Sequence, residues 1–377
     1  MKFLPILLAG LSAAAPSRPG LLQRRQDAST RTLILGAPGQ IIAAQFNGAE
    51  FSVVAKDEQE GTGPSWMLFR NPELFYAVNE NSDKLRLFSF NAQANELKQV
   101  VELESSAGVV HLEFNQDQTR MVGSAYGNGT IDVWDTSAED GTPTLIKTLK
   151  SGGELAPASS EPTPIKPSLT PRAVSSSSTT SAPIASSSST PKTTHTRSPI
   201  TSSSREAATH YTVVCERTNQ LLTYSLTYSD DSIDFSNVRP TSTFGDAFPK
   251  NATTAAAGEV VLSANGRDLY VSNRLTGNDT DSISHFRASA SGCLTFKGQV
   301  SSGGVLPRMI SLSADSSQGT LFAANQKGDN GLVAFRRDSS GILISVPVAA
   351  AELSAFAEAG SDLGPQFVLE VPAAASS

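Results

Sequence analysis

Charged residues recur in this sequence where short apolar strands begin or end. Glu80, Glu216 and Arg274 each close an apolar segment, and Glu259 and Arg308 each open one. A carboxylate can take up and release a proton, and a guanidinium group binds carboxylates or phosphates through paired hydrogen bonds. If the fold gathers these positions, the set can hold a small anion and move a proton on it.

The segments that carry these residues belong to a repeat. Residues 64–90, 109–134, 258–286 and 307–335 share one order: an apolar strand, a turn, a second apolar strand, a turn, and a strand that ends in an aromatic residue. A period of roughly 45 to 50 residues with three or four short strands is typical of β-propeller blades, because one blade cannot bury both of its faces alone. The sequence therefore predicts an all-β propeller.

Six blades are recognisable. The first blade combines strands within residues 32–56 with a closing strand at 366–371, so both chain ends contribute to it. The other five blades are predicted at residues 64–103, 107–148, 205–245, 256–301 and 305–346.

Strand direction predicts where the charged residues meet. The inner strand of a blade and the next strand run antiparallel, so the residue that opens the first lies beside the residue that closes the second. This rule pairs Arg205 with Glu216 and Glu259 with Arg274, and it places Glu80 and Arg308 at the same mouth of one central channel. The alternative, equally open for any single residue, is that Arg and Glu at strand ends only pair with each other.

Composition divides the chain into four parts. Residues 1–25 contain an apolar run and small residues typical of a secretory signal peptide, followed by the dibasic pair Arg24 and Arg25, which is either a cleavage site or a chance pair. Propeller sequence then fills residues 26–150 and 205–377. Between them, residues 151–204 are nearly all Ser, Thr, Pro and Ala, which predicts a disordered insert.

Three Asn-X-Thr sequons are predicted glycosylation sites, at Asn128, Asn251 and Asn278. With the signal peptide, they predict a secreted protein that is extracellular or associated with the cell wall. Cys215 and Cys293 are the only cysteines, both in predicted strands, and the sequence leaves a disulfide and two free thiols equally open.

The net charge of -7 and the pI near 5.2 argue against nucleic acid as a partner, because binding there needs clustered Lys and Arg. No segment is a predicted transmembrane span. The sequence has no Cys/His cluster, no P-loop and no GxGxxG motif after a strand, so we expect neither a metal nor another cofactor. The oligomeric state stays open.

Four motifs carry a resemblance to a known family: SWMLFRNPELFYAVNE, HYTVVCERTNQLLTYSL, AAAGEVVLSANGRDLYVSNR with DSISHF, and GGVLPRMISLSADSSQGTLFAANQ. Here the sequence resembles the lactonase-type seven-bladed β-propellers, which include bacterial 6-phosphogluconolactonase and fungal carboxy-cis,cis-muconate cyclase. It is most similar to the secreted fungal cyclase-like glycoproteins.

The resemblance implies a catalytic set of Glu216, Arg274 and Arg205. Arg308, Glu80 and Glu259, which strand direction places at the same channel mouth, are the predicted substrate-binding residues. The family's catalytic His stands in a His-x-His segment followed by an Asp-rich turn, and this sequence has the Ser/Thr/Pro-rich insert in that place. The His-bearing blade has been replaced, or the sequence reads through an intron. The missing His leaves turnover open.

Two functions therefore remain. The first is a lactonase or muconate cycloisomerase that acts on, or binds, a small anionic lactone or carboxylate at the channel mouth. The second is a non-catalytic secreted glycoprotein, a surface antigen or adhesion scaffold that keeps the propeller and has lost the His-bearing blade. Fold alone cannot choose between them, because function depends on the site.

Overall fold

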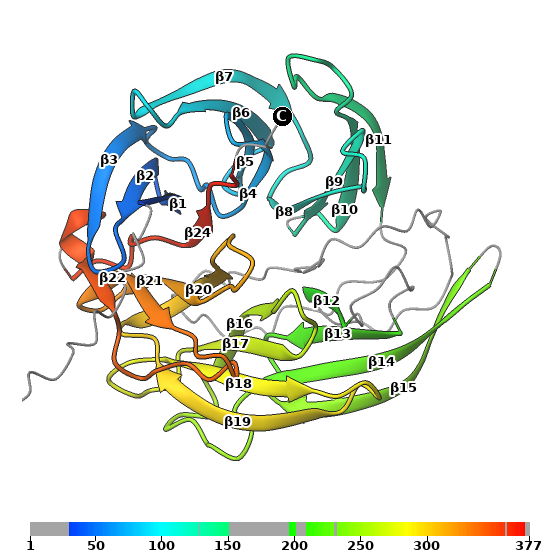
Figure 1. Ribbon diagram of the computed structural model, residues 1–377. Helices are drawn as coiled ribbons and strands as arrows, with labels where there is room; N and C mark the ends of the chain where they lie inside the picture. The colour runs from blue at the N-terminus through cyan, green and yellow to red at the C-terminus, as the bar shows by residue number, and fades with distance from the viewer. Residues whose placement is uncertain are drawn as a thin grey trace, which may run out of the picture.

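The computed structural model describes residues 30–126, 128–150, 209–229, 232–358 and 360–373, and the backbone of 196–200. These residues form six four-stranded antiparallel sheets arranged around a common centre (Figure 1). Within the described ranges, no helix is long and apolar enough to cross a membrane. The predicted all-β propeller is confirmed.

The first three sheets come from the N-terminal half, with one strand from the C-terminus. The first sheet contains β24 (Phe367–Glu370), β1 (Arg31–Ala37), β2 (Gln40–Phe46) and β3 (Phe51–Glu58). The second contains β4 (Met67–Asn71), β5 (Leu74–Asn79), β6 (Lys84–Asn91) and β7 (Glu96–Glu104). The third contains β8 (Val109–Phe114), β9 (Arg120–Ala125), β10 (Thr130–Asp135) and β11 (Thr144–Lys150).

The other three sheets follow in chain order. The fourth contains β12 (Thr196–Ile200), β13 (His210–Cys215), β14 (Gln220–Tyr228) and β15 (Ile233–Ser242). The fifth contains β16 (Ala256–Leu262), β17 (Asp268–Arg274), β18 (Ser282–Ala288) and β19 (Leu294–Ser301). The sixth contains β20 (Val305–Leu312), β21 (Thr320–Lys327), β22 (Asn330–Arg336) and β23 (Ala349–Glu352), followed by the short 3₁₀ helix η1 (Leu353–Ala355).

The C-terminal strand closes the ring, as the sequence predicts. β24 pairs antiparallel with β1, with Leu33 opposite Glu370 and Gly36 opposite Phe367. The first sheet is thus built from both ends of the chain. This pairing places the residue before β24, Gln366, beside the inner strands of the other sheets.

Two predicted boundaries differ from the structure. β12 lies within the segment 151–204 that the sequence predicts to be a disordered insert, so the fourth sheet begins before residue 205. Its backbone pairs with β13, with Thr196 opposite Val214. Such pairing uses main-chain groups, so an apolar pattern does not reveal it. The last sheet also extends past residue 346 to β23. The predicted leader 1–25 and the rest of the insert lie outside the described residues.

Asparagine side chains close several of the hairpins. The Oδ1 atom of Asn71 accepts hydrogen bonds from the backbone N–H groups of Glu73 and Leu74, at 2.9 and 2.8 Å. The Oδ1 atoms of Asn47 and Asn91 likewise accept hydrogen bonds from the backbone N–H groups two and three residues later in the chain. A carboxamide that replaces a backbone acceptor in this way fixes a tight turn between strands.

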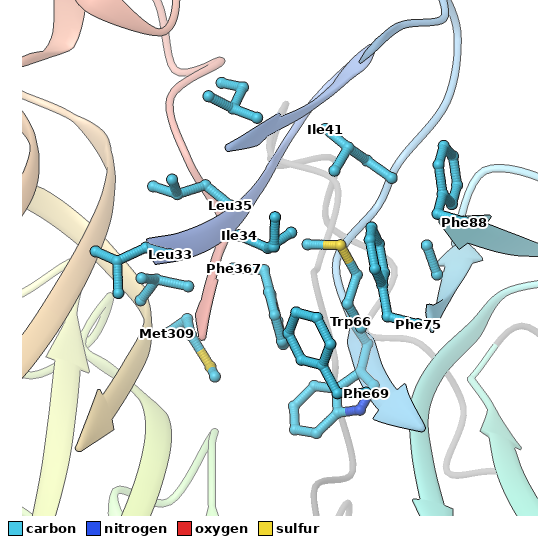
Figure 2. Close-up of a cluster of buried hydrophobic side chains, with 14 of the residues drawn as sticks. Leu33, Ile34, Leu35, Ile41, Trp66, Phe69, Phe75, Phe88, Met309 and Phe367 are labelled. Carbon is cyan, nitrogen blue, oxygen red and sulfur yellow. The ribbon is translucent and has the colours of Figure 1, made fainter. Parts of the chain in front are cut away.

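The core fills the spaces between neighbouring sheets. Central strands such as β5, β17 and β21 are buried on both faces, whereas β9 and β14 alternate buried and partly exposed residues. The largest apolar cluster joins the last sheet to the first three, and Figure 2 shows Trp66, Phe75, Met309 and Phe367 within it. Burial between sheets explains why the repeat is stable only as a ring.

A repeated tyrosine also links neighbouring sheets. Tyr76 on β5 donates its hydroxyl to the carbonyl oxygen of Gly141, in the loop between β10 and β11 of the next sheet, at 2.6 Å. Tyr270 on β17 makes the equivalent bond to Gly341, between β22 and β23. Both tyrosines are fully buried, so each hydroxyl needs a partner.

Candidate functional site

A pocket opens where the inner strands of several sheets meet. With the solvent at its open side included, the space measures about 420 Å³. Its walls are Ser65, Trp66, Val214, Glu216, Ala257, Gly258, Glu259, Arg274, Arg308, Met309 and Gln366. Three acidic or basic residues from different sheets, Glu216, Arg274 and Arg308, thus reach one small space.

Glu216 and Arg274 form an ion pair between the fourth and fifth sheets. Glu216 directly follows β13 and Arg274 ends β17; the Nη2 atom of Arg274 lies 2.5 Å from Oε1 of Glu216. The same Nη2 donates to the carbonyl oxygen of Ala257 at 3.1 Å, and the N–H of Ala257 donates to the carbonyl of Glu216 at 3.0 Å. The pair is therefore fixed by main chain as well as by charge.

Arg308 is held by two other parts of the chain. Its two terminal nitrogens donate to the two carboxylate oxygens of Glu80, at 3.1 and 2.6 Å. Nη1 also donates to Oε1 of Gln366, the residue before the closing strand β24, at 2.8 Å. Paired bonds of this kind fix the plane of a guanidinium group as well as its position.

Irregular strand pairing aims several of these side chains into the pocket. The register of β20 against β21 shifts between Pro307 and Met309, which leaves Arg308 as the extra residue. A similar shift in β16, between Ala257 and Val260, includes Glu259. Such bulges re-aim side chains and are common beside active sites.

Gly258 is required by the close packing at this point. A Cβ atom there would lie 2.5 Å from the hydroxyl oxygen of Ser272 and 3.3 Å from Nε of Arg274. Ser272 in turn accepts the backbone N–H of Glu259 at 2.8 Å. The missing side chain lets the Arg274 guanidinium group lie against β16.

The environment of Glu216 raises the pKa of its carboxyl group. Burial is the larger effect, and it outweighs the attraction of Arg274, Arg308 and Arg217, which lowers the pKa. Its second carboxylate oxygen, Oε2, is buried and makes no hydrogen bond to the protein. A buried carboxylate with a raised pKa in a pocket is a candidate for proton transfer.

Trp66 forms an apolar wall of the pocket. Its indole N–H donates to the carbonyl oxygen of Leu112 on β8 at 3.0 Å. Its ring lies 4.6 Å from the His111 ring and 5.4 Å from that of Phe367, measured between centroids. Three sheets thus fix the tryptophan that limits the pocket on one side.

The structure brings together most of the residues that the sequence selects. Glu216, Arg274, Arg308 and Glu259 line the pocket, and Glu80 stands behind Arg308 as its ion-pair partner. Arg205 lies outside the described residues. The sequence predicts it at the opening of an inner strand, but that strand is Thr196–Ile200, which Arg205 follows in the chain.

Gln366 is the site residue that sequence reasoning missed. A signal was present, since Gln366 is the first residue of the predicted closing strand 366–371; in the structure it directly precedes β24, and Arg308 lies within β20. The three sequon asparagines, Asn128, Asn251 and Asn278, are exposed.

Neither Cys215, which is buried, nor Cys293, which is exposed, forms a disulfide in the structure. Cys293 precedes β19 and does not lie in a strand, contrary to the prediction. Across the described ranges, no group of three or more His, Cys, Asp or Glu side chains is placed to hold a metal ion.

Comparison with known proteins connects this geometry to a family. A probable 6-phosphogluconolactonase of Arthroderma benhamiae is 24% identical over 246 residues, which are 60% of this chain and 61% of that protein. The chain therefore matches less than two thirds of that relative's length.

Solved structures share the fold. The periplasmic gluconolactonase PpgL of Pseudomonas aeruginosa superposes with a TM-score of 0.66 at 19% identity, covering 91% of this chain and 99% of that one. A protein from Lactobacillus plantarum superposes with a TM-score of 0.59 at 16% identity, covering 85% of this chain and 98% of that one.

The family described as lactonase, 7-bladed beta-propeller, matches residues 28–167 and 189–351. These ranges include all six described sheets except the closing strand and the end of β23. On this match, together with the propeller fold, the chain belongs to the seven-bladed β-propeller lactonase family.

Proposed function

We propose that this protein opens a small lactone that carries an anionic group, in the pocket between Glu216, Arg274 and Arg308. The observation that carries the proposal is Glu216: a buried carboxylate with a raised pKa, which has one oxygen on Arg274 and the other without a protein partner. A carboxylate of this kind can act as a general base near neutral pH.

The chemistry needs only water and the lactone. The Glu216 carboxylate takes a proton from a water molecule as the water oxygen adds to the lactone carbonyl carbon. Negative charge then develops on the carbonyl oxygen, where a guanidinium group stabilises it. The bond from the acyl carbon to the ring oxygen breaks, and the ring oxygen receives the proton from Glu216, which gives a hydroxy acid.

The arginines suit an anionic substrate. Arg274 and Arg308 have side chains that are each 8% exposed, so a ligand carboxylate or phosphate would meet them largely out of water. The names of the Arthroderma and Pseudomonas relatives support lactone opening. Muconate cyclisation is a different reaction, in which a substrate carboxylate oxygen adds to a carbon of the C=C bond and the neighbouring carbon takes up a proton; protonated Glu216 would supply that proton.

The test is hydrolysis of glucono-δ-lactone and 6-phosphoglucono-δ-lactone. The measured quantity is the rate of acid release in excess of the spontaneous rate. We expect Glu216→Gln to lower kcat by about 10²–10⁴-fold, the usual contribution of a positioned general base. Glu104→Gln, an exposed carboxylate on β7, is the matched control and should keep full activity. Activity that survives Glu216→Gln would overturn the proposed mechanism.

One observation favours the second candidate, a non-catalytic binding scaffold. Both pocket arginines already pair with protein carboxylates, Arg274 with Glu216 and Arg308 with Glu80. In a scaffold these pairs would serve stability alone. Binding of 6-phosphogluconate without turnover of either lactone would support this candidate.

We also propose that the protein is secreted. The support is the signal-peptide pattern of residues 1–25 and the exposure of all three sequon asparagines. Immunodetection in the culture medium of cells that express the full chain tests this. Retention of the full-length chain inside the cells would contradict it.

A further inference from the structure

Two leucines beside the pocket arginines have left-handed backbone conformations. Leu275, which directly follows Arg274, has φ of 56°, and Leu306, two residues before Arg308, has φ of 59°. A branched side chain is rarely found in this region, and such strain persists only where the surrounding structure holds it. Pro307 restricts Leu306 further, because the residue before a proline has fewer allowed conformations.

One buried carboxylate holds both leucines. Oδ2 of Asp281 accepts the backbone N–H of Leu275 at 3.1 Å and that of Leu306 at 2.8 Å. Oδ1 accepts the N–H and the hydroxyl of Thr276, at 2.9 and 2.7 Å. Asp281 is 2% exposed, so these four bonds satisfy a carboxylate that water hardly reaches.

The main chain of Asp281 reinforces the same connection. Its N–H donates to the carbonyl oxygen of Gly304 at 2.9 Å, and its own carbonyl accepts the N–H of Ser302 at 2.8 Å. Asp281 lies between β17 and β18 of the fifth sheet, whereas Ser302 and Gly304 lie in the connection to β20 of the sixth. The residue therefore ties together the two segments that carry Arg274 and Arg308.

We infer that Asp281 is a positioning residue that sets the placement of Arg274 and Arg308 relative to each other, by holding Leu275 and Leu306 in left-handed conformations. The inference rests on the proposed function of the pocket. Asp281 does not line the pocket, and it acts on a ligand only through the two arginines.

Replacement by asparagine is the sharpest test because it keeps the shape. A carboxamide has only one acceptor oxygen. Its NH₂ group would face some of the N–H groups that Asp281 now binds, and two donors cannot form a hydrogen bond with each other. We expect Asp281→Asn to lower kcat/KM for the lactones by about 10²-fold, the effect of a misplacement of about 1 Å. KM should rise in the same variant, since both anion-binding groups, Arg274 and Arg308, move.

The acid side of the pH profile separates positioning from loss of fold. The charges of Arg274, Arg308 and Arg217 act on Glu216, which in turn acts on Tyr126, and Glu259 lines the same pocket. If Arg274 and Arg308 move away, less positive charge stabilises the carboxylate, and the acid limb of kcat/KM should move to higher pH. Partial unfolding would lower the whole profile without moving it.

Asp132 offers a matched control. It is fully buried on β10 and accepts the N–H and hydroxyl of Ser106 and the hydroxyl of Thr148, at 2.6, 2.8 and 2.6 Å. Asp132→Asn removes comparable bonds in the third sheet and touches neither arginine. We expect it to lower the thermal midpoint and to leave KM and the acid limb unchanged.

Glycine variants test the backbone part of the inference. Glycine adopts positive φ without steric cost. Adding Leu275→Gly and Leu306→Gly to Asp281→Asn should therefore recover part of the lost kcat/KM. No recovery, with a wild-type acid limb in Asp281→Asn, would overturn the positioning role.

Crystal structures give a readout that needs no ligand. In Asp281→Asn we expect Leu275 and Leu306 to leave the left-handed region and both guanidinium groups to shift; unchanged positions would overturn the inference. If the wild-type protein neither binds 6-phosphogluconate nor opens the lactones, the proposed function fails. The crystallographic comparison would then still decide the role of Asp281.

Discussion

Arg308 and Glu80 are 228 residues apart in sequence, and their side chains form a two-bond ion pair, with Nη1 to Oε1 at 3.1 Å and Nη2 to Oε2 at 2.6 Å. One residue comes from the sixth sheet and the other follows β5 of the second. Because the closing strand lies between these sheets, the pair spans the point where the ring is joined.

Breaking this pair should destabilise the fold. Arg308→Met removes the ion pair with Glu80, and we expect a loss of about 3 kcal/mol in the free energy of unfolding. This is the low end of the range for a buried pair, because Glu80 is partly exposed. Denaturant titration measures it. Lys84→Met, which removes the exposed ion pair with Glu104, should cost about 0–1 kcal/mol. Equal losses in the two variants would contradict a special role for Arg308.

Arg274→Ala should weaken binding of an anionic ligand. A charge-assisted contact to a largely desolvated carboxylate or phosphate is worth roughly 2–5 kcal/mol when one partner is removed. Calorimetry with 6-phosphogluconate measures the change in affinity. Arg120→Ala, at an exposed ion pair with Asp135 on the third sheet, is the control and should bind as the wild type does. Unchanged affinity in Arg274→Ala would remove this residue from the site.

The raised pKa of Glu216 predicts how stability depends on pH. The folded protein holds this proton more tightly than the unfolded chain, so the contribution of Glu216 is favourable below the unfolded pKa near 4.5 and is lost as pH rises through the folded value. Between pH 4 and neutral pH, the wild type should therefore lose more stability than Glu216→Gln does. Thermal midpoints of both proteins across pH 4–8 test this. Parallel curves would contradict the raised pKa.

Gly258→Ala should disturb the site more than the fold. The added methyl group would meet Ser272 and the Arg274 guanidinium, and overpacking of this kind costs roughly 1–3 kcal/mol. We expect a clear rise in KM for the lactones. Gly319→Ala is the control, because its Cβ would approach only the Ser317 hydroxyl, at 3.1 Å. Wild-type KM in Gly258→Ala would show that the arginine does not depend on this close approach.

The sequons Asn251 and Asn278 lie on adjoining loops, since the N–H of Asn251 donates to the carbonyl oxygen of Thr276 at 2.7 Å. If the protein is secreted, we expect glycans at exposed Asn128, Asn251 and Asn278, and a loss of mass on treatment with an N-glycosidase. Mass spectrometry of the secreted protein measures the occupancy of each site, with the Asn→Gln variants as controls. An unmodified secreted chain would contradict the prediction.

Local pattern accounts for much of what could be predicted. The repeat and its turns indicated the propeller, and the antiparallel rule placed Glu216, Arg274 and Arg308 at one mouth. The same rule would have found Gln366. It could not locate β12, because that strand is formed by main-chain pairing in a segment without an apolar pattern.

The sequence by itself determined the fold class, the closing strand and the strand-end positions of Glu216 and Arg274, because alternation of apolar residues and turn chemistry are local properties. Only the tertiary structure decided which partners these charges take. Arg308 pairs with Glu80, and Asp281 holds Leu275 and Leu306. Both relationships depend on how separate sheets pack around the ring, and contacts between segments far apart in the chain leave no mark in the pattern of either segment alone.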